Sequence, residues 1–358
     1  MHMKKPETLY IGGYQGQNTR CLYAYNYDTQ KKSFEKLESY EIVNTTYLCF
    51  SPDKRYLYAV IEVDNYKGHT GGGVAAFAVG QEGRLHFLND NFTEGGAPCH
   101  LSVSADGKTL YAVNYHGGST IIFDLLPSGE IGNKKILVNH KYLGSPSHYV
   151  TGRQEMPHAH YVQPVYIGAI LTLWVCDLGL DAVLVLNESG DEAARFQTPP
   201  GFGPRHLAFH PILPLAYIVG ELACAVITLE YGFDGTVLLI KASQEIPVLE
   251  NDYIDTTCAA IRVSPERNHL LVSNRKAGDE GSISVLCLDA SGKITGLKMI
   301  VPSSGYCPRD FAFNPAGDKV FVAHEDSDKV DIFDWSQERL LTHTGKAFNV
   351  QKPACILL

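Results

Sequence analysis

The sequence predicts an all-β fold, a seven-bladed β-propeller built from four-stranded antiparallel blades. A short phrase, opened by proline or a small residue, recurs seven times and each time leads into an apolar strand. Successive phrases lie about 45–60 residues apart, a spacing typical of propellers and solenoids. Val, Ile, Tyr and Phe dominate the segments between them, and no segment shows helical periodicity. The openings are Thr45-Thr46-Tyr47-Leu48, Pro98-Cys99-His100-Leu101, Pro157-His158-Ala159-His160, Pro204-Arg205-His206-Leu207, Cys258-Ala259-Ala260-Ile261, Pro308-Arg309-Asp310-Phe311 and Pro353-Ala354-Cys355-Ile356.

Each repeat reads as four strands separated by turn residues. In the repeat that opens at Pro98, Ala105-Asp106-Gly107 and Gly117-Gly118 form the first two turns, and Ser128-Gly129 precedes the fourth strand. Proline, aspartate and glycine at these points are typical of tight turns. The first three strands of this repeat are expected at 100–104, 109–114 and 119–124.

The two ends of the chain complement each other. Residues 8–14, 21–28 and 34–42 read as three strands without an opening phrase, whereas 353–358 supply an opening phrase with nothing after it. Together they make one complete blade, and pairing the last strand with the first segment would remove exposed sheet edges. The prediction is therefore a closed ring that forms a single domain over residues 1–358.

The composition limits the possible partners. Hydrophobic residues make up 45% of the chain and charged residues 19%, as in globular proteins. The net charge of −9 argues against nucleic acid and against anionic membranes, so that an anionic small molecule would need a local cationic site. The longest apolar stretch, 165–176, is too short to span a bilayer. The sequence gives no indication of the oligomeric state.

The cysteines and the N-terminus favour a cytoplasmic location. The nine cysteines are dispersed without C-x-x-C pairs, which is typical of reduced thiols in the cytosol. Residues 1–6 contain no apolar run of the kind found in secretory signals.

Counting outward from each first turn places polar residues at one end of the predicted channel. The first two strands of a blade form a hairpin, so residues equidistant from its turn face each other. A sixth hairpin, whose turn would be centred on Ile167 and Gly168, has a longer interval and would set His158 opposite Asp177. A slip of one residue in any hairpin would change the facing side chain. The five pairs with a common interval are Arg205 with Glu221, Arg309 with Glu325, Ala259 with Arg275, Thr46 with Glu62, and Cys99 with Tyr115.

Arginines, carboxylates and histidines that converge on one axis indicate a functional site at this mouth. Other motifs support fewer functions. The His158-Ala159-His160 pair lacks a third ligand, so that we expect no metal. Gly71-Gly72-Gly73 is not followed by Lys-Ser/Thr and is no phosphate-binding P-loop. No Gly-x-Ser-x-Gly elbow is present, and no cofactor is expected.

A resemblance to a known family is carried by five segments, GPRHLAFHP at 203–211, AYIVGEL at 216–222, DLGLD at 177–181, SNR at 273–275 and NYHGG at 114–118. The chain resembles the cycloisomerase-2 type of seven-bladed lactonase over essentially its whole length. That family includes the propeller 6-phosphogluconolactonases and the fungal carboxy-muconate lactonizing enzymes.

The resemblance implies an active cleft lined by one histidine, two arginines and one glutamate. Carried over by position, these are the catalytic candidates His158, Arg205, Glu221 and Arg275. An apparent insertion at 141–155 leaves His160 as the alternative to His158. The further candidates for substrate binding are His160, Asp177, His206, Arg309 and Asn114.

The chemistry that the resemblance implies is hydrolysis of an anionic small-molecule lactone, with 6-phosphogluconolactone as the favoured substrate. His158 would take a proton from the attacking water, and Asp177 would orient its imidazole. Arg205 or Arg275 would stabilise the oxyanion. The other arginine of that pair, together with Arg309, would hold a phosphate or carboxylate. Glu221 would fix Arg205 or act as the base itself.

Two other functions remain open from the sequence. Cyclisation of a carboxylated muconate would use the same histidine, arginine and glutamate set. A non-catalytic propeller that binds a protein or peptide is the alternative of a different class, because fold does not imply function. Such a binding module should show a broad exposed apolar face, whereas an enzyme should show a polar cleft at the channel.

Overall fold

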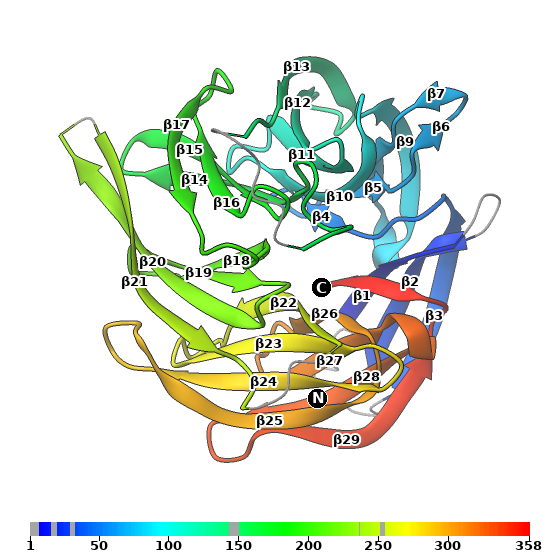
Figure 1. Cartoon of the computed structure of the whole chain (residues 1–358). Coiled ribbons are helices and arrows are strands. Elements are labelled where there is room, and N and C mark those ends of the chain that lie inside the picture. The colour runs from blue at the N-terminus through cyan, green and yellow to red at the C-terminus, as the bar shows by residue number, and fades with distance from the viewer. Residues whose placement is uncertain (1–6, 16–19, 29–32, 143–149, 236, 251–254) are drawn as a thin grey trace.

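A computed structural model describes residues 7–15, 20–28, 33–142, 150–235, 237–250 and 255–358. Within these residues the strands form seven four-stranded antiparallel sheets arranged around a central axis (Figure 1). The predicted seven-bladed propeller is therefore confirmed. Residues 1–6, on which the expectation about a secretory signal rested, lie outside the described part of the chain.

Each blade runs from an inner strand at the axis to an outer strand at the rim. The first three blades are, from the inside outward, β30 (Pro353–Leu357), β1 (Glu7–Gly13), β2 (Arg20–Asp28) and β3 (Ser33–Glu41); β4 (Leu48–Phe50), β5 (Tyr56–Ile61), β8 (Gly73–Val79) and β9 (Leu85–Phe92); and β10 (Gly96–Val103), β11 (Thr109–His116), β12 (Ser119–Leu125) and β13 (Ile131–Asn139).

The other four blades follow the same order around the ring. They are β14 (Ala159–Ile167), β15 (Ile170–Asp177), β16 (Ala182–Leu186) and β17 (Glu192–Gln197); β18 (Pro204–Phe209), β19 (Leu215–Gly220), β20 (Ala225–Asp234) and β21 (Val237–Pro247); β22 (Thr256–Val263), β23 (His269–Lys276), β24 (Glu280–Leu288) and β25 (Ile294–Tyr306); and β26 (Pro308–Phe313), β27 (Lys319–His324), β28 (Lys329–Ser336) and β29 (Leu340–Asn349).

Little else is added to these strands in the described residues. A two-stranded hairpin, β6 (Asn65–Tyr66) with β7 (His69–Thr70), projects between β5 and β8 and was not predicted. Two single turns of 3₁₀-helix, Gln81–Gly83 and Glu325–Ser327, are the helical elements of the described chain. The absence of helical periodicity in the sequence agrees with this.

The ring closes between the two ends of the chain, as predicted. Strand β30 is the innermost strand of the blade that β1, β2 and β3 complete, and Ile11 lies opposite Ile356. The fit is tight at Gly12, because a Cβ atom there would lie 1.9 Å from the carbonyl oxygen of Thr45. The closing strand therefore hides the edge that β1 would otherwise expose.

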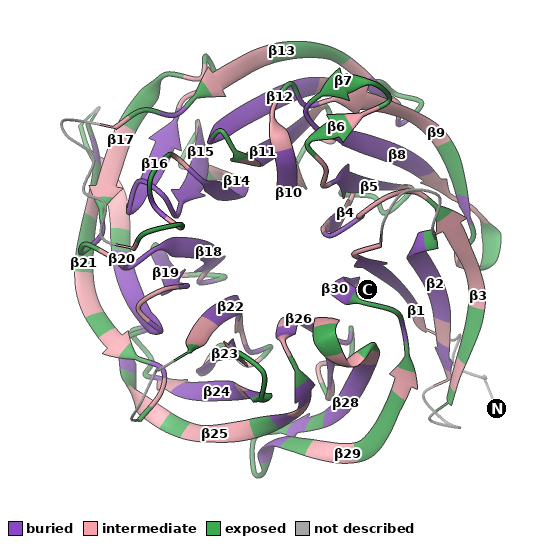
Figure 2. Cartoon of the chain, turned by 45° about the vertical axis from the view of Figure 1, so that its right-hand side comes forward, coloured by how far each residue is buried: buried purple, intermediate pink, exposed green. Residues whose placement is uncertain are grey.

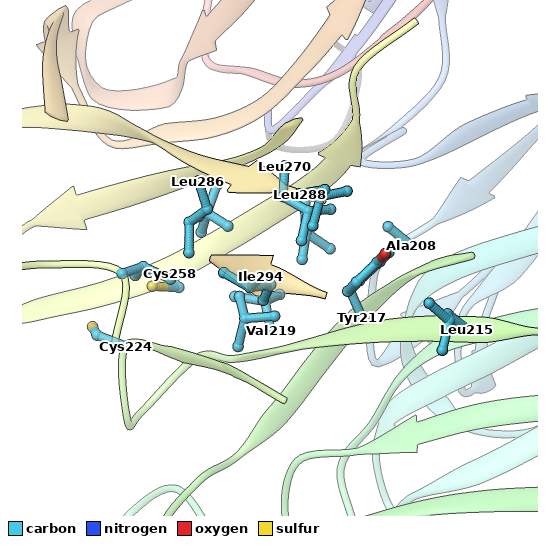
Figure 3. Close-up of a cluster of buried hydrophobic side chains, with 14 residues drawn as sticks. Ala208, Leu215, Tyr217, Val219, Cys224, Cys258, Leu270, Leu286, Leu288 and Ile294 are labelled. Carbon is cyan, nitrogen blue, oxygen red and sulfur yellow. The ribbon is translucent and has the colours of Figure 1, made fainter. Parts of the chain in front are cut away.

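The apolar core is divided into clusters that lie between adjacent blades. One cluster joins Tyr217 and Val219 of β19 to Leu270 of β23 and Leu286 of β24 (Figure 3). Inner and middle strands are largely buried, and the outer strands alternate between exposed and partly buried residues (Figure 2). Side chains on both faces of each blade pack against the neighbouring blades. Polar side chains can therefore gather at the ends of the central axis.

Candidate active site

A β-bulge marks the start of the inner hairpin in five blades. At this point the register shifts between Pro98 and His100, Ala159 and Tyr161, Pro204 and His206, Cys258 and Ile261, and Pro308 and Asp310. A bulge leaves its extra residue outside the ladder and redirects its side chain. The residues released in this way include Cys99, His160, Arg205 and Arg309, and all four line space at the mouth of the channel.

The bulge corrects the predicted register of the fourth blade. Asp177 lies opposite Ala159 and not opposite His158, and the hairpin turns at Gly168 and Ala169, between Ile167 and Ile170. This hairpin is longer than its counterparts. Its bulge comes two residues later in the opening phrase than the bulges at Arg205 and Arg309. His160, rather than His158, therefore occupies the position that corresponds to Arg205 and Arg309.

A second correction concerns the counted pairs with a common interval. The backbone partner of Arg275 is Thr257 instead of Ala259, because the bulge of this hairpin falls at residues 259–260. The backbone N–H of Glu221 likewise donates to the carbonyl oxygen of Gly203, two residues before Arg205. The side chains of several counted pairs are nevertheless in contact. Glu325 lies 3.2 Å from Arg309, and the Thr46 hydroxyl group donates to Glu62.

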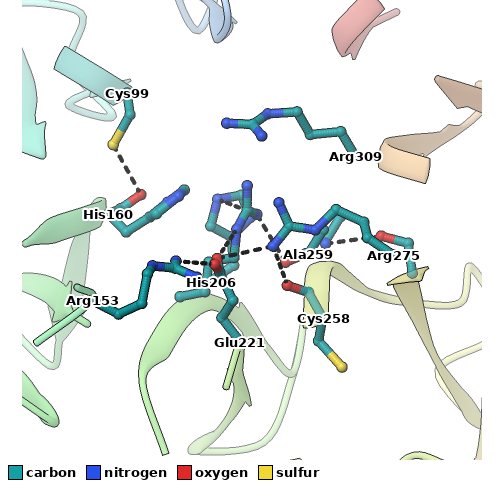
Figure 4. Close-up of polar contacts among 12 residues, drawn as sticks. Cys99, Arg153, His160, His206, Glu221, Cys258, Ala259, Arg275 and Arg309 are labelled. Carbon is teal, nitrogen blue, oxygen red and sulfur yellow. Dashed lines mark hydrogen bonds and ion pairs between the residues drawn. The ribbon is translucent and has the colours of Figure 1, made fainter. Parts of the chain in front are cut away.

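Glu221 gathers three arginines at the mouth. The Nε atom of Arg205 lies 2.9 Å and the Nη2 atom of Arg275 lies 3.1 Å from its Oε2 atom, while Arg153 contacts Oε1. Figure 4 shows Arg153 and Arg275 reaching Glu221 from opposite sides. Burial by itself would raise the pKa of Glu221, but Arg275 and Arg205 outweigh it and hold this pKa well below the usual range. Such a carboxylate is a weak base and a strong anchor for cations.

Arg205 and Arg275 are fixed by backbone carbonyl groups as well. Arg205 donates to the carbonyl oxygen of Ala259 at 2.9 Å, and Arg275 donates to that of Cys258 at 2.9 Å. Burial lowers the pKa of Arg205 to about 10, so that it still carries a positive charge at neutral pH. Both guanidinium groups are thereby oriented before any ligand arrives.

Arg309 and Glu62 occupy the other side of the mouth. Arg309 pairs with Glu325 and donates to the Tyr14 hydroxyl group at 2.7 Å, and that hydroxyl group donates to Glu62 at 2.8 Å. Burial raises the pKa of Glu62. This carboxyl group is therefore the one at the mouth that most readily holds a proton.

Neutral histidines line the axis below the arginines. The rings of His160 and His206 lie 5.3 Å apart, and those of His100 and His206 lie 5.4 Å apart. Burial lowers the pKa of all three imidazoles well below the usual value. The Nδ1 atom of His160 is buried and has no hydrogen-bond partner among the described residues, while the residue itself lines the cleft.

These groups surround one polar cleft of about 260 Å³ at the mouth of the ring. A chamber of about 10 Å³, bordered by His160, Arg205, His206 and Asp310 among others, lies next to it along the axis. A polar cleft at the channel is the feature that favours an enzyme over a binding module. The cleft is lined by Glu62, Cys99, Tyr115, Arg153, His160, Glu221, Thr257, Arg275 and Arg309.

Three predicted substrate-binding residues do not line this cleft. His206 borders the small chamber next to it, whereas Asp177 and Asn114 are buried among the strands. The side chain of Asp177 is fully buried, where it accepts from the His158 backbone N–H at 2.7 Å and contacts Nδ1 of His140 at 2.7 Å. Asn114 is fully buried and donates to the Thr93 carbonyl oxygen and the Ser119 hydroxyl oxygen. Through these contacts Asp177 and Asn114 hold neighbouring strands together instead of lining the cleft.

His158 is also removed from the predicted role. Its Nδ1 atom lies 2.9 Å from the carbonyl oxygen of Tyr115, which requires the proton to be on Nδ1. Its ring stacks on that of Tyr115 with centroids 4.5 Å apart. It does not line the cleft, and Asp177 binds its backbone rather than its imidazole.

Two charged cleft residues, Arg153 and Glu62, were not among the candidates selected from the sequence. Arg153 belongs to the insertion at 141–155, of which residues 143–149 lie outside the described part of the chain. Arg153 falls at no repeat position, so no pattern in the sequence indicates a role for it. Glu62 had already been placed at the mouth by its pairing with Thr46, and that pairing was the signal that could have identified it.

Among the described residues, no group of three or more His, Cys, Asp and Glu side chains is placed to hold a metal ion. No described helix is long and apolar enough to cross a membrane.

Comparison with known proteins agrees with the geometry. The family model described as "Lactonase, 7-bladed beta-propeller" matches residues 8–358. This chain belongs to that lactonase family. A 6-phosphogluconolactonase of Bacillus subtilis is 30% identical to it over 97% of both chains.

Solved structures of the lactonase propeller type are also similar. A Bacteroides fragilis protein, provisionally named a 6-phosphogluconolactonase, shares 27% identity with a TM-score of 0.87 over 100% of this chain and 99% of its own. A periplasmic gluconolactonase of Pseudomonas aeruginosa shares 26% identity with a TM-score of 0.86 over 98% of each chain. The lactonase family membership thus fits a cleft that is polar and rich in arginine.

The depressed pKa of Glu221 predicts a specific pH dependence of stability in this lactonase propeller. The unfolded chain takes up the proton first as the pH falls, so the arginine contacts of Glu221 stabilise the fold above about pH 4.3 and lose that effect below it. We expect the difference in unfolding free energy between the wild type and Glu221→Gln to be large at about pH 7 and smaller at about pH 3. Urea titrations at both pH values measure it.

The matched control is Glu192→Gln, which removes a surface carboxylate that pairs with Arg195 at 2.7 Å. This control should change stability little at either pH. A wild-type to Glu221→Gln difference that stays constant across this pH range would contradict the assignment.

Proposed function

We propose that this member of the lactonase family hydrolyses the ring ester of a sugar lactone, with 6-phosphogluconolactone as the favoured substrate. The observation that carries the proposal is one cleft in which a neutral imidazole, His160, lies beside arginines anchored by Glu221. The cleft combines a proton acceptor with cationic groups, which is what ester hydrolysis of an anionic substrate requires.

In the proposed reaction His160 takes a proton from water while the water oxygen attacks the lactone carbonyl carbon. Negative charge develops on the carbonyl oxygen, and Arg275, which faces the cleft, stabilises it. The bond between the carbonyl carbon and the ring oxygen then breaks. The ring oxygen receives a proton, for which Glu62 is the candidate donor because burial favours its protonated form.

Glu221 has a supporting role in this scheme. Its pKa is held too low for efficient proton abstraction at neutral pH, but its two oxygens align the guanidinium groups. Arg205 is almost fully buried beneath the cleft, and its position favours a role in fixing Glu221 over direct contact with substrate. Arg309 also lines the cleft, where it pairs with Glu325 at 3.2 Å.

The test is an assay of purified protein in which proton release reports lactone hydrolysis. We expect the wild type to accelerate hydrolysis of 6-phosphogluconolactone, and Arg275→Ala to lower kcat by about 10²–10³-fold, as for the loss of one oxyanion donor. A carboxylated muconate, assayed in parallel, tests the cyclisation alternative.

Arg84→Ala is the matched control, because Arg84 forms an exposed ion pair with Glu38 at 3.3 Å and does not line the cleft. It should retain wild-type turnover. Hydrolysis by the wild type no faster than the uncatalysed reaction would refute the proposed function.

A further inference from the structure

Arg153 is held differently from the other arginines at the mouth. Arg205 and Arg275 are 3% and 13% exposed, and each is tied to a backbone carbonyl group. Arg153 is 35% exposed, and its hydrogen-bonding partners among the described residues are the side chains of Glu221 and Tyr115. A guanidinium group has five N–H donors, so Arg153 keeps donors directed toward solvent at the cleft.

The backbone that carries Arg153 is nevertheless fixed to the propeller. The neighbouring Gln154 is fully buried and donates through Nε2 to the carbonyl oxygen of Leu178 at 2.9 Å. The Tyr142 hydroxyl group donates to the Gln154 carbonyl oxygen at 2.9 Å.

The segment also passes very close to Gly179. A Cβ atom at that glycine would lie 1.9 Å from the carbonyl oxygen of Met156. The backbone near Arg153 is thus held at the rim, and the Arg153 side chain lines the cleft.

The charges around Glu221 do not require Arg153. Arg205 and Arg275 together already exceed the single negative charge of this carboxylate. Arg309, in contrast, is balanced by Glu325 at 3.2 Å. Arg153 therefore adds a positive charge in excess at the entrance of a cleft, in a protein whose net charge is −9. A local excess of this kind attracts an anion.

We propose that Arg153 recognises the anionic group of the substrate. The Arg153 guanidinium group separates from Glu221 and makes a bidentate contact with a phosphate or carboxylate carried outside the lactone ring. This inference rests on the proposed lactonase function and extends it to substrate selection. The planar guanidinium group matches both anions, and charge-assisted contacts of this type are stronger than neutral ones. Arg153 is then a specificity-determining residue, whereas His160 and Arg275 act on the ring ester that all such lactones share.

The decisive experiment compares the kinetics of the wild type, Arg153→Ala and Arg153→Lys on two lactones that differ only in the phosphate group. For the phosphorylated lactone, we expect Arg153→Ala to lower kcat/KM about 100-fold, mostly through KM, because a charge-assisted contact is lost. For the unphosphorylated lactone, the change should stay within about 3-fold. Arg153→Lys should recover part of the loss, since lysine keeps the positive charge but lacks the paired N–H donors of the guanidinium group.

A third substrate, a lactone that carries a carboxylate instead of a phosphate, shows which of the two anionic groups Arg153 binds. A loss confined to that substrate would still support anion recognition by Arg153 and would assign the carboxylate. Equal losses on charged and uncharged lactones, or no loss on any of them, would overturn the inference. Arg84→Ala serves as the control for removal of an arginine from a surface ion pair.

A binding measurement separates this inference from the proposed function. Calorimetry with 6-phosphogluconate and gluconate should show tighter binding of the phosphorylated acid by the wild type, and Arg153→Ala should abolish that preference. If the wild type hydrolyses neither lactone, the proposed function fails while the binding comparison still decides the role of Arg153. If 6-phosphogluconate and gluconate bound with equal affinity, to the wild type and to Arg153→Ala alike, the inference about Arg153 would be overturned.

Discussion

Replacing His160 with alanine should lower kcat by about two to four powers of ten, the range typical of losing a general base. His160 occupies the bulge position of the fourth inner hairpin and lines the cleft. Its Nδ1 atom has no partner among the described residues, and burial keeps the ring neutral by lowering its pKa. Steady-state kinetics on the lactone that the wild type hydrolyses best would measure the effect.

His158→Ala is the matched control, because it removes an identical side chain two residues away. His158 stacks on Tyr115 outside the cleft, so we expect less than about a 10-fold change in kcat. Since the lowered pKa keeps His160 unprotonated, wild-type kcat should also remain flat between about pH 6 and 8. If His158→Ala were the damaging variant and His160→Ala retained turnover, the assignment of the base would be reversed.

The second large effect is expected on stability. Deleting residues 353–358 removes the inner strand β30, including Ala354, Cys355 and Ile356, which are almost fully buried. The deletion also exposes the edge of β1 and opens the ring. We expect the Tm to fall by about 10 °C or more, because several kcal/mol are lost and each kcal/mol shifts the Tm of a large domain by about 2–4 °C.

Deletion of Leu358 alone is the control, since this residue lies beyond β30. It should shift the Tm by less than a third of the full effect. Differential scanning calorimetry would measure both deletions, and an unchanged Tm in the longer deletion would contradict closure by β30.

The architecture was predictable because its determinants are local and repeated. Alternating apolar residues and turn residues mark each strand independently of the rest of the chain. The strands expected at 109–114 and 119–124 appear as Thr109–His116 and Ser119–Leu125. The unpaired C-terminal phrase was enough to predict closure, because only the three-stranded N-terminal segment lacked such a strand.

The site was predictable only where every hairpin had the same length. Counting placed Arg205 with Glu221 and Arg309 with Glu325, and these pairs are in contact. The same count misplaced Arg275, where the bulge shifts the register, and the fourth blade, where a longer hairpin separates the opening phrase from the bulge. A bulge has no distinct sequence signature here, so the choice between His158 and His160 depended on strand pairing.

The sequence by itself determined the repeat, the ring and the mouth toward which its charged residues point. The tertiary structure decided which of those residues share a cleft. Arg153 and Glu221 are distant along the chain, and their contact depends on the anchoring of Gln154 against Leu178 in the same blade as His160. Periodicity records which face a residue occupies within its own blade. Contacts between blades are set by packing, which a linear pattern does not encode.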